Sequence, residues 1–224
     1  MTSAPISVAP SLGSLGLDFP DGWMSLPIEP EQQREVCDRL RGELAVGNGR
    51  DETTWDETTW RGWEAGVELL HDQLAHVRAV SAAIHTEVST STTTSTRRDV
   101  VMAVGLVGWL DRSDFGPALP LTPGNLVSAA PMVRTTSPRR LPNIVNLEPP
   151  AVVRVAGWEG VRLRRHVSVR TGPVAVHGLY AESYFVPSTE DADRVAFLMF
   201  TTPNEHLSRR FAPTFAEVAD TLMC

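Results

Sequence analysis

Lysine is absent from this chain of 224 residues, so all 20 of its basic residues are arginines. Without lysine the protein has neither a Schiff-base nucleophile nor the lysine of a phosphate-binding loop. Arginine in its place has two explanations: the codon usage of a GC-rich genome, as in actinobacteria, or a need for bidentate contacts with anions. Both explanations stay open, and under either one lysine-dependent chemistry is excluded.

Cysteine and long apolar runs are also scarce. Cys37 and Cys224 are the two cysteines, too few for a disulfide framework, which favours a reducing compartment. No run approaches the roughly 18 apolar residues of a transmembrane helix, and the first residues lack the basic and apolar segments of a secretory signal. We therefore expect a cytoplasmic protein with no membrane contact.

Acidic residues outnumber the arginines, which gives a formal net charge of −7. Up to Thr96, 6 arginines stand against 15 acidic residues, and from Arg97 onward 14 stand against 12. A nucleic-acid-binding protein needs a concentrated basic face, which this distribution does not provide. We therefore expect no nucleic-acid partner.

The motifs of common enzyme classes are missing or incomplete. No serine lies in a Gly-x-Ser-x-Gly turn, and Gly105 and Gly108 lack the third glycine of a dinucleotide-binding loop. Glu68 and His71 match the Glu-x-x-His unit of di-iron proteins, but such sites need two copies of it. We therefore predict no catalytic residues, no metal site and no cofactor, and a protein that is not an enzyme.

The front of the chain divides into an arm and the start of a domain. Residues 1–20 are rich in Ser, Pro, Gly and Ala, which predicts a flexible arm, and residues 21–224 are predicted to form a single α+β domain. A short edge strand is predicted over 22–28. A helix is predicted over 30–49, begun by Pro30 and stopped by glycines.

The pentapeptide Asp-Glu-Thr-Thr-Trp occurs twice in succession, at 51–55 and 56–60. Asp56 or Thr58 in the second copy can cap a helix, because their side-chain oxygens accept from the free N–H groups of the first turn. The repeat therefore predicts a helix start. The alternative is that its twin tryptophans, Trp55 among them, are displayed for a partner.

A helix is predicted after the repeat, because apolar residues recur at spacings of three and four over 60–77. Residues 78–91 fit either a continuation of that helix or a strand, since apolar and polar residues alternate there. The Ser/Thr-rich run that follows favours extended backbone, so we predict a β-hairpin whose second strand covers 97–110. If the helix continues instead, 60–88 would form an exposed coiled coil.

Eight prolines punctuate residues 111–150, which predicts a short helix over 122–130 and otherwise a long crossing loop. Valine-rich segments joined by short turns then predict an antiparallel meander of four strands. These strands are predicted at 151–158, 160–170, 176–187 and 193–203.

The last predicted strand is apolar on both faces and therefore needs cover on both. A closing helix over 205–223, interrupted by Pro213, and the helix over 60–77 can provide the two covers. The predicted fold class is therefore α+β: an antiparallel β-sheet covered by helices on both faces, an α/β/α sandwich.

Basic residues alternate along the second strand of the meander and project to one face. This row consists of Arg162, Arg164, His166 and Arg170. Such a row can bind an acidic partner surface or an anion. It can equally pair across the next hairpin with Glu182, Tyr180 and Tyr184. Arg165 falls out of phase and requires a carboxylate partner or a bulge.

Three segments carry a family pattern: FPDGWMSLPI (Phe19–Ile28), VVRVAGWEGVRLRR (Val152–Arg165) and VAFLMFTTPNEHLSRRFAPTFAEVADTL (Val195–Leu222). In their order and character they resemble the PsbP-like α/β/α sandwich family, which includes small actinobacterial proteins of the LpqN kind. The resemblance spans Phe19 to Leu222. Members of that family share no catalytic residues and mostly act as accessory or assembly factors, which is the function that the resemblance implies here.

These patterns together predict a non-enzymatic accessory protein that binds another protein through a sheet face or the proline-rich crossing. In an actinobacterial setting, a part in a secretion, assembly or toxin-immunity system would fit. The predicted partner-binding residues are Arg162, Arg164, His166, Arg170 and Trp55. The alternative is a small-ligand-binding protein or an enzyme with a pocket between sheet and helices. That pocket would use His166, His177, Glu182 and Arg164.

Overall fold

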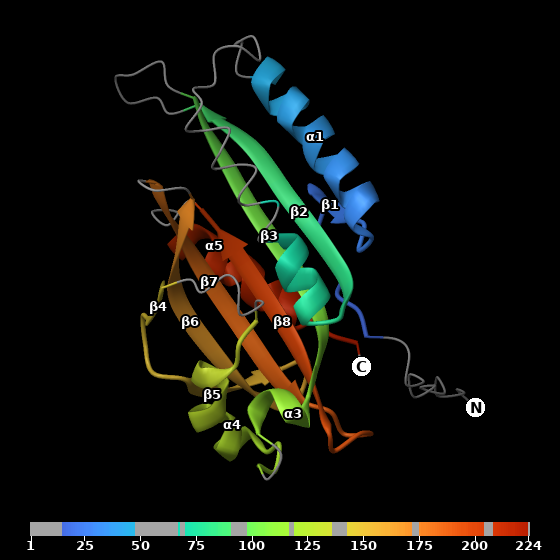
Figure 1. The fold of residues 1–224 in the computed structure, drawn as a ribbon, viewed down its shortest axis with the longest axis vertical. Helices are drawn as coiled ribbons and strands as arrows, with labels where there is room; N and C mark the ends of the chain where they lie inside the picture. Colours follow the sequence, from blue (N-terminus) through green and yellow to red (C-terminus); the bar gives the residue numbers. More distant parts are fainter. Residues whose placement is uncertain are drawn as a thin grey trace, which may run out of the picture.

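The computed structural model of the protein describes residues 15–47, 67, 70–90, 98–116, 119–135, 143–171, 175–203 and 208–223. Within this part of the chain, eight strands form one sheet (Figure 1). They are β1 (Trp23–Leu26), β2 (Ala79–Thr90), β3 (Arg98–Asp111), β4 (Asn143–Asn146), β5 (Ala151–Val155), β6 (Trp158–Thr171), β7 (Ala175–Pro187) and β8 (Arg194–Thr202).

The strand order is β1-β2-β3-β8-β7-β6-β4, and every pair is antiparallel. β5 lies on the same side of β6 as β4, because β7 occupies the other side. β4 and β5 therefore follow one another along the last edge of the sheet. The prediction of a large antiparallel sheet in an α+β protein is confirmed.

The N-terminal half follows the predicted order of elements. β1 forms an edge of the sheet beside β2, and α1 (Pro30–Gly47) begins at the predicted proline. Residues 70–76 are helical, and the chain then enters β2. The hairpin of β2 and β3 is thus confirmed, and a helix through 78–91, with the coiled coil that depended on it, is wrong. The repeated pentapeptide and Trp55 lie outside the described residues.

The proline-rich crossing contains more regular structure than the long loop that we predicted. α3 (Arg112–Phe115) follows β3 directly, and α4 (Pro123–Ala129) continues into the 3-10 helix η2 (Ala130–Met132). The Oγ1 of Thr122 accepts a hydrogen bond from the N–H of Asn125 at 3.4 Å and caps α4, so the short helix predicted over 122–130 is confirmed. Farther along, β4 is a strand because it pairs with β6, which a four-residue pattern could not reveal.

The C-terminal meander is confirmed, because β5, β6, β7 and β8 pair in sequence order. α5 (Ser208–Ala219) then runs as one helix with Pro213 inside it, whereas we expected an interruption there. A proline removes a backbone hydrogen bond from a helix. Aromatic packing opposes that loss: Phe215 stacks on Phe211 and on Phe200, with ring centroids 5.6 and 5.0 Å apart.

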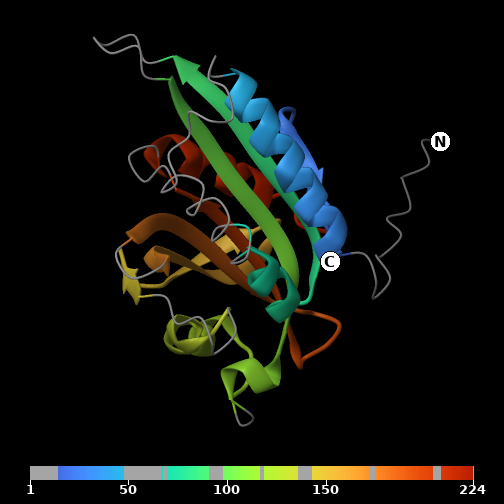
Figure 2. The same ribbon diagram turned by 45° about the horizontal axis from the view of Figure 1, so that its top comes forward.

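Side chains of β8 alternate between two core clusters, as the period of a strand requires. The odd-numbered apolar residues of β8 lie in a cluster with residues of α1 and α4. The even-numbered ones lie in a second cluster with residues of α5. Figure 2 shows α1 running alongside β2, which places its apolar side against the first cluster. β8 is thus buried on both faces.

The beginning of the described chain is packed against its end. Gly16 and Met223 exchange two backbone hydrogen bonds of 3.1 Å, and Leu15 and Leu17 are buried in the second cluster. We assigned residues 1–20 to a flexible arm, but residues 15–20 belong to the packed body of the protein. The prediction rested on the Ser, Pro, Gly and Ala content of residues 1–20 and overlooked these two leucines, which complete the apolar cluster beside α5.

Candidate functional site

The basic row on β6 faces three polar residues of β7. In the register of this antiparallel pair, Arg164 lies opposite Glu182, while His166 and Arg162 lie opposite the flanking tyrosines. Residues that are directly opposite in an antiparallel pair project to the same face, so alternation on both strands gathers these side chains together. We call Arg162, Arg164, Tyr180, Glu182 and Tyr184 the carboxylate network.

Glu182 is the centre of the carboxylate network, and its side chain is 0 % exposed. Its Oε2 accepts from Arg164 Nε at 2.9 Å and from the Tyr180 hydroxyl at 2.7 Å. Its Oε1 accepts from the Tyr184 hydroxyl at 2.6 Å and, at 3.4 Å, from the second arm of the Arg164 guanidinium. Both oxygens of the buried carboxylate are therefore hydrogen-bonded, as a buried charge requires.

The network shifts the titration of the groups around Glu182. Burial raises the pKa of Tyr180 and of Tyr184, and the Glu182 carboxylate raises both pKa values further, because a phenolate beside it would repel it. Burial by itself lowers the pKa of Arg164, but its hydrogen bond to Glu182 and the charge of that carboxylate outweigh the burial and raise it. The raised pKa values keep the Arg164 guanidinium and both tyrosine hydroxyls protonated, so all three act as donors to Glu182.

A second carboxylate, Glu148, extends the network toward the edge of the sheet. Its Oε1 lies 3.1 Å from Nη2 of Arg162 and 3.6 Å from Nη1 of Arg164. Glu148 belongs to the link between β4 and β5, so the two arginines fasten that link to β6. Sequence reasoning missed Glu148, because no periodic pattern marks a residue that precedes two prolines.

The predicted partner-binding residues meet different outcomes. Arg162, Arg164 and His166 are brought to one face, and the pairing of the arginine row with Glu182 and its tyrosines is confirmed. Arg170 lies in β6 opposite Val176, with its side chain outside the described part. Binding of a partner by this row stays a prediction.

The alternative pocket is only partly assembled. Arg164, His166 and Glu182 lie on one face, but His177 pairs with Val169, an odd-numbered position of β6, out of phase with the even-numbered row. The side chain of His177 lies outside the described part. His166 is closely packed over Gly178, where an added Cβ would lie 2.5 Å from its Nε2. Glu182 is saturated with donors, so it has no oxygen left for a substrate.

Arg165, the out-of-phase residue, lies on the opposite face of β6 and is only 4 % exposed. We expected a carboxylate partner or a bulge. Among the described residues it finds instead the carbonyl oxygen of Ala130, to which its guanidinium donates at 2.8 Å at the end of α4. Burial lowers the pKa of Arg165 to about 10. A cation at the C-terminal end of a helix is favourable, because the free carbonyl groups there are acceptors.

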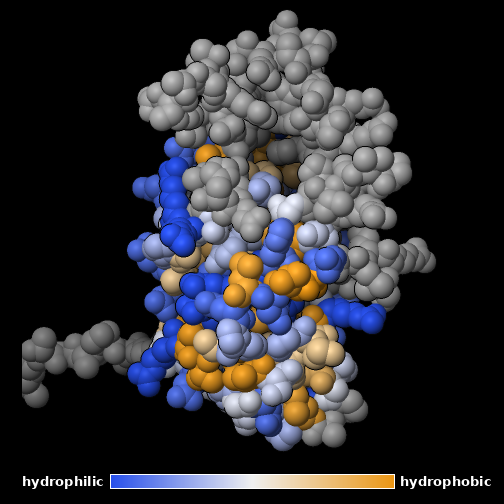
Figure 3. Space-filling model, turned by 90° about the vertical axis from the view of Figure 1, so that its left-hand side faces the viewer, coloured by the Kyte–Doolittle hydropathy of each residue, from blue (hydrophilic) through white to orange (hydrophobic). Residues whose placement is uncertain are grey.

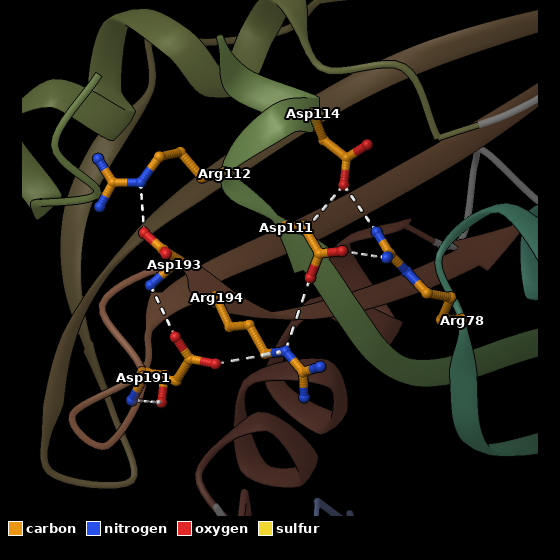
Figure 4. A network of polar contacts seen from close by, with 8 residues as sticks. Arg78, Asp111, Arg112, Asp114, Asp191, Asp193 and Arg194 are labelled. Atoms are coloured by element: carbon orange, nitrogen blue, oxygen red, sulfur yellow. Dashed lines mark hydrogen bonds and ion pairs between the residues drawn. The ribbon is translucent and has the colours of Figure 1, made fainter. Parts of the chain in front are cut away.

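A second polar cluster fastens strand ends and turns on the surface (Figure 4). Arg78, just before β2, contacts both Asp111 at the end of β3 and Asp114 in α3. Arg112 Nε lies 2.6 Å from Asp193 Oδ1 in the turn between β7 and β8. These side chains are partly exposed and pair with one another across neighbouring elements. We therefore conclude that the cluster stabilises the fold and is not a binding site.

Two other kinds of site are not found in the described ranges. No group of three or more His, Cys, Asp or Glu residues there could hold a metal ion. No helix of the same ranges combines the length and apolar character needed to cross a bilayer.

The chain was compared with known families, curated proteins and solved structures. No family model and no curated protein matches the chain. Among solved structures, the chain is similar to LpqN of Mycobacterium tuberculosis, described as involved in cell envelope biogenesis. The two are 13 % identical with a TM-score of 0.43, over 96 % of this chain and 87 % of LpqN. The class of this protein, α+β with one antiparallel sheet, follows from its own strand pairs.

Proposed function

We propose that this chain is a non-enzymatic accessory protein that binds another protein at the edge of the sheet formed by β4 and β5. The proposal takes the fold as an α/β/α sandwich, supported by the two core clusters on either side of β8. In this arrangement the interior serves packing, and the contact with a partner lies at an edge that the helices leave open.

One observation carries the proposal: apolar side chains are exposed on the α4 side of that edge. Met132, at the end of η2, is 81 % exposed, and Ile144 of β4 and Val152 of β5 are also exposed. Ile144 pairs with Val167 and Val152 with Val161, so both project to the face of β6 on which Arg165 meets α4. We call Met132, Ile144 and Val152 the edge surface.

Figure 3 looks onto the side of the molecule where β4, β5 and α4 lie in Figure 1. Apolar side chains gather there in groups separated by polar ones. Ile144 and Val152 pair with β6 positions six residues apart, so the edge surface is a row of apolar side chains along the edge. A partner that covers this row removes it from water, which is favourable. The carboxylate network supports the same function indirectly, since its ionisable groups satisfy one another and hold the β4–β5 link in place.

The test is capture of partners from the organism that encodes the chain. We expect a stoichiometric partner with the native protein and its loss with the triple variant Met132→Ser, Ile144→Ser, Val152→Ser. The matched control is Val80→Ser, because Val80 of β2 is 46 % exposed but lies outside the edge surface. Recovery of the native protein alone would overturn the proposal, as would equal capture by the triple variant.

A further inference from the structure

We propose that two copies of this chain associate by pairing their β4 strands antiparallel, about a two-fold axis at Val145. The inference goes beyond the proposed function, because it uses the backbone of β4 and is centred on Val145, whose side chain lies on the face opposite the edge surface. It names a second copy of the chain as the occupant of the free edge of β4.

Among the described residues, no strand pairs with the outer edge of β4, so the backbone groups on that edge have no partner in this part of the chain. β4 ends the strand order, and each of its four residues is exposed. The N–H of Leu147 donates to the carbonyl oxygen of Arg164 on β6 at 2.9 Å, just beyond β4. In an antiparallel pair, alternate residues direct both backbone groups to the same neighbour. Val145 therefore bonds toward β6, while the N–H and C=O groups of Ile144 and Asn146 point away from the sheet.

One register uses all four of these outward groups. If Val145 lies opposite Val145 of the second copy, then Ile144 of each copy lies opposite Asn146 of the other. Each of these two pairs exchanges two backbone hydrogen bonds, which gives about four bonds in total. A register with Asn146 opposite Asn146 has only that one hydrogen-bonded pair within β4. A register with Ile144 opposite Ile144 places Asn146 opposite Pro142, which has no N–H to donate.

The two side chains that meet at the axis of this register are apolar. Val145 is 54 % exposed and Leu147 is 50 % exposed. Val145 lies opposite His166 on β6, so its side chain is on the face of the carboxylate network, away from the edge surface. The two copies of Val145 would form a close non-hydrogen-bonded pair at the axis. Leu147 would flank that pair on each side, opposite Asn143 of the other copy.

The charges favour a second copy over a charged partner. Edge strands that do not pair with another chain commonly carry charged residues that prevent such pairing, but Asn143–Asn146 contains no charged residue. Behind it, the two carboxylates Glu148 and Glu182 balance the two arginines Arg162 and Arg164. The charges of these four described residues therefore cancel on this face, and two identical copies can meet there although each carries a formal net charge of −7.

The first test is the mass of the full chain in solution, measured by light scattering over a range of concentrations. We expect the mass of two chains of 24.5 kDa each, and the mass of one chain with Val145→Lys. Two lysines would face each other at the axis, where like charges repel. Val80→Lys, with circular dichroism as a check on folding, must remain dimeric. A single-chain mass for the native protein, or a dimer that survives Val145→Lys, would overturn the inference.

The second test reads the register by disulfide cross-linking, in a Cys224→Ser background with Cys37 buried. Opposite residues of a non-hydrogen-bonded pair have Cα atoms about 4.5 Å apart, within reach of a disulfide. On mild oxidation Val145→Cys should give a covalent dimer, and Ile144→Cys, which lies opposite Asn146, should not. Equal cross-linking by both variants would overturn the register.

The outcomes separate this inference from the proposed function. If Val145→Lys is a monomer that still captures the partner, and the double variant Met132→Ser, Val152→Ser, which leaves β4 unchanged, is a dimer that does not, both the inference and the proposed function stand. If the native chain is a monomer and Val145→Lys loses the partner, β4 accepts a strand of another protein, and the second-copy inference is wrong while partner binding survives.

Discussion

Arg164 and Glu182 lie directly opposite each other on β6 and β7 and form an ion pair whose guanidinium reaches both carboxylate oxygens. Glu182 is fully buried, while a quarter of the Arg164 side chain remains exposed. The arginine thus closes the outer end of a buried polar network, and the two tyrosines complete it from the same strand as the carboxylate.

Removal of the arginine should therefore be costly. Arg164→Leu leaves Glu182 buried without its cation, and we expect it to lower the free energy of unfolding by about 3 kcal/mol. The matched control is Arg162→Leu, whose ion partner Glu148 is partly exposed, so the expected loss is about 1 kcal/mol or less. Urea denaturation of the three proteins measures both effects. Equal losses would show that burial of Glu182 does not depend on Arg164.

The two tyrosines of the chain, Tyr180 and Tyr184, should titrate abnormally. The pKa of each is raised in the folded state, first by burial. We expect the folded protein to show little phenolate absorbance near pH 10, where tyrosines of the denatured chain ionise. A raised folded pKa contributes stability that is full below about pH 10 and is lost as the pH rises above it. Ordinary titration of the folded protein near pH 10 would contradict the network.

Cys37 of α1 should be unreactive in the folded protein. Burial, and secondarily the charge of Asp38, raise the pKa of its thiol to about 11, so the thiolate is rare near neutral pH. In a Cys224→Ser background, Ellman's reagent should detect no thiol in the folded state and one after denaturation. Prompt reaction of the folded protein would show that α1 opens readily from the sheet.

Two glycines should respond oppositely to alanine. A Cβ on Gly108 of β3 would collide with the carbonyl oxygen of Val77 and lie 2.9 Å from the Cα of Ala79. Because these are backbone atoms, we expect Gly108→Ala to cost about 2 kcal/mol or more. Gly124 of α4 has nothing within 4 Å of such a Cβ, so Gly124→Ala should stabilise by about 0.5 kcal/mol. Thermal unfolding measures both, and a harmless Gly108→Ala would contradict the close approach of β3 to the start of β2.

Much of the fold was predictable from local pattern. The hairpin of β2 and β3, the meander from β5 to β8 and the cap at Thr122 follow from alternation and turn chemistry, which act between near neighbours in sequence. The row on β6 and its pairing with Glu182 were predictable for the same reason, since a short turn fixes the register of two adjacent strands.

Other features could not be predicted, because they depend on residues far apart in the chain. Arg165 meets Ala130, 35 positions away, only because α4 packs on that face of β6. Leu15 and Leu17 are buried because the C-terminal end of the chain returns beside them. Glu148 joins the carboxylate network because β4 and β5 share one edge of β6.

The amino-acid sequence by itself determined the strands other than β4, which faces are apolar and which arginines share a side, since the period of each segment fixes those properties locally. The tertiary structure decided which carboxylates those arginines meet and which apolar residues stay in contact with water. Burial of a side chain depends on what covers it, and in this protein the covers come from distant parts of the chain, while β4 is left uncovered at the edge.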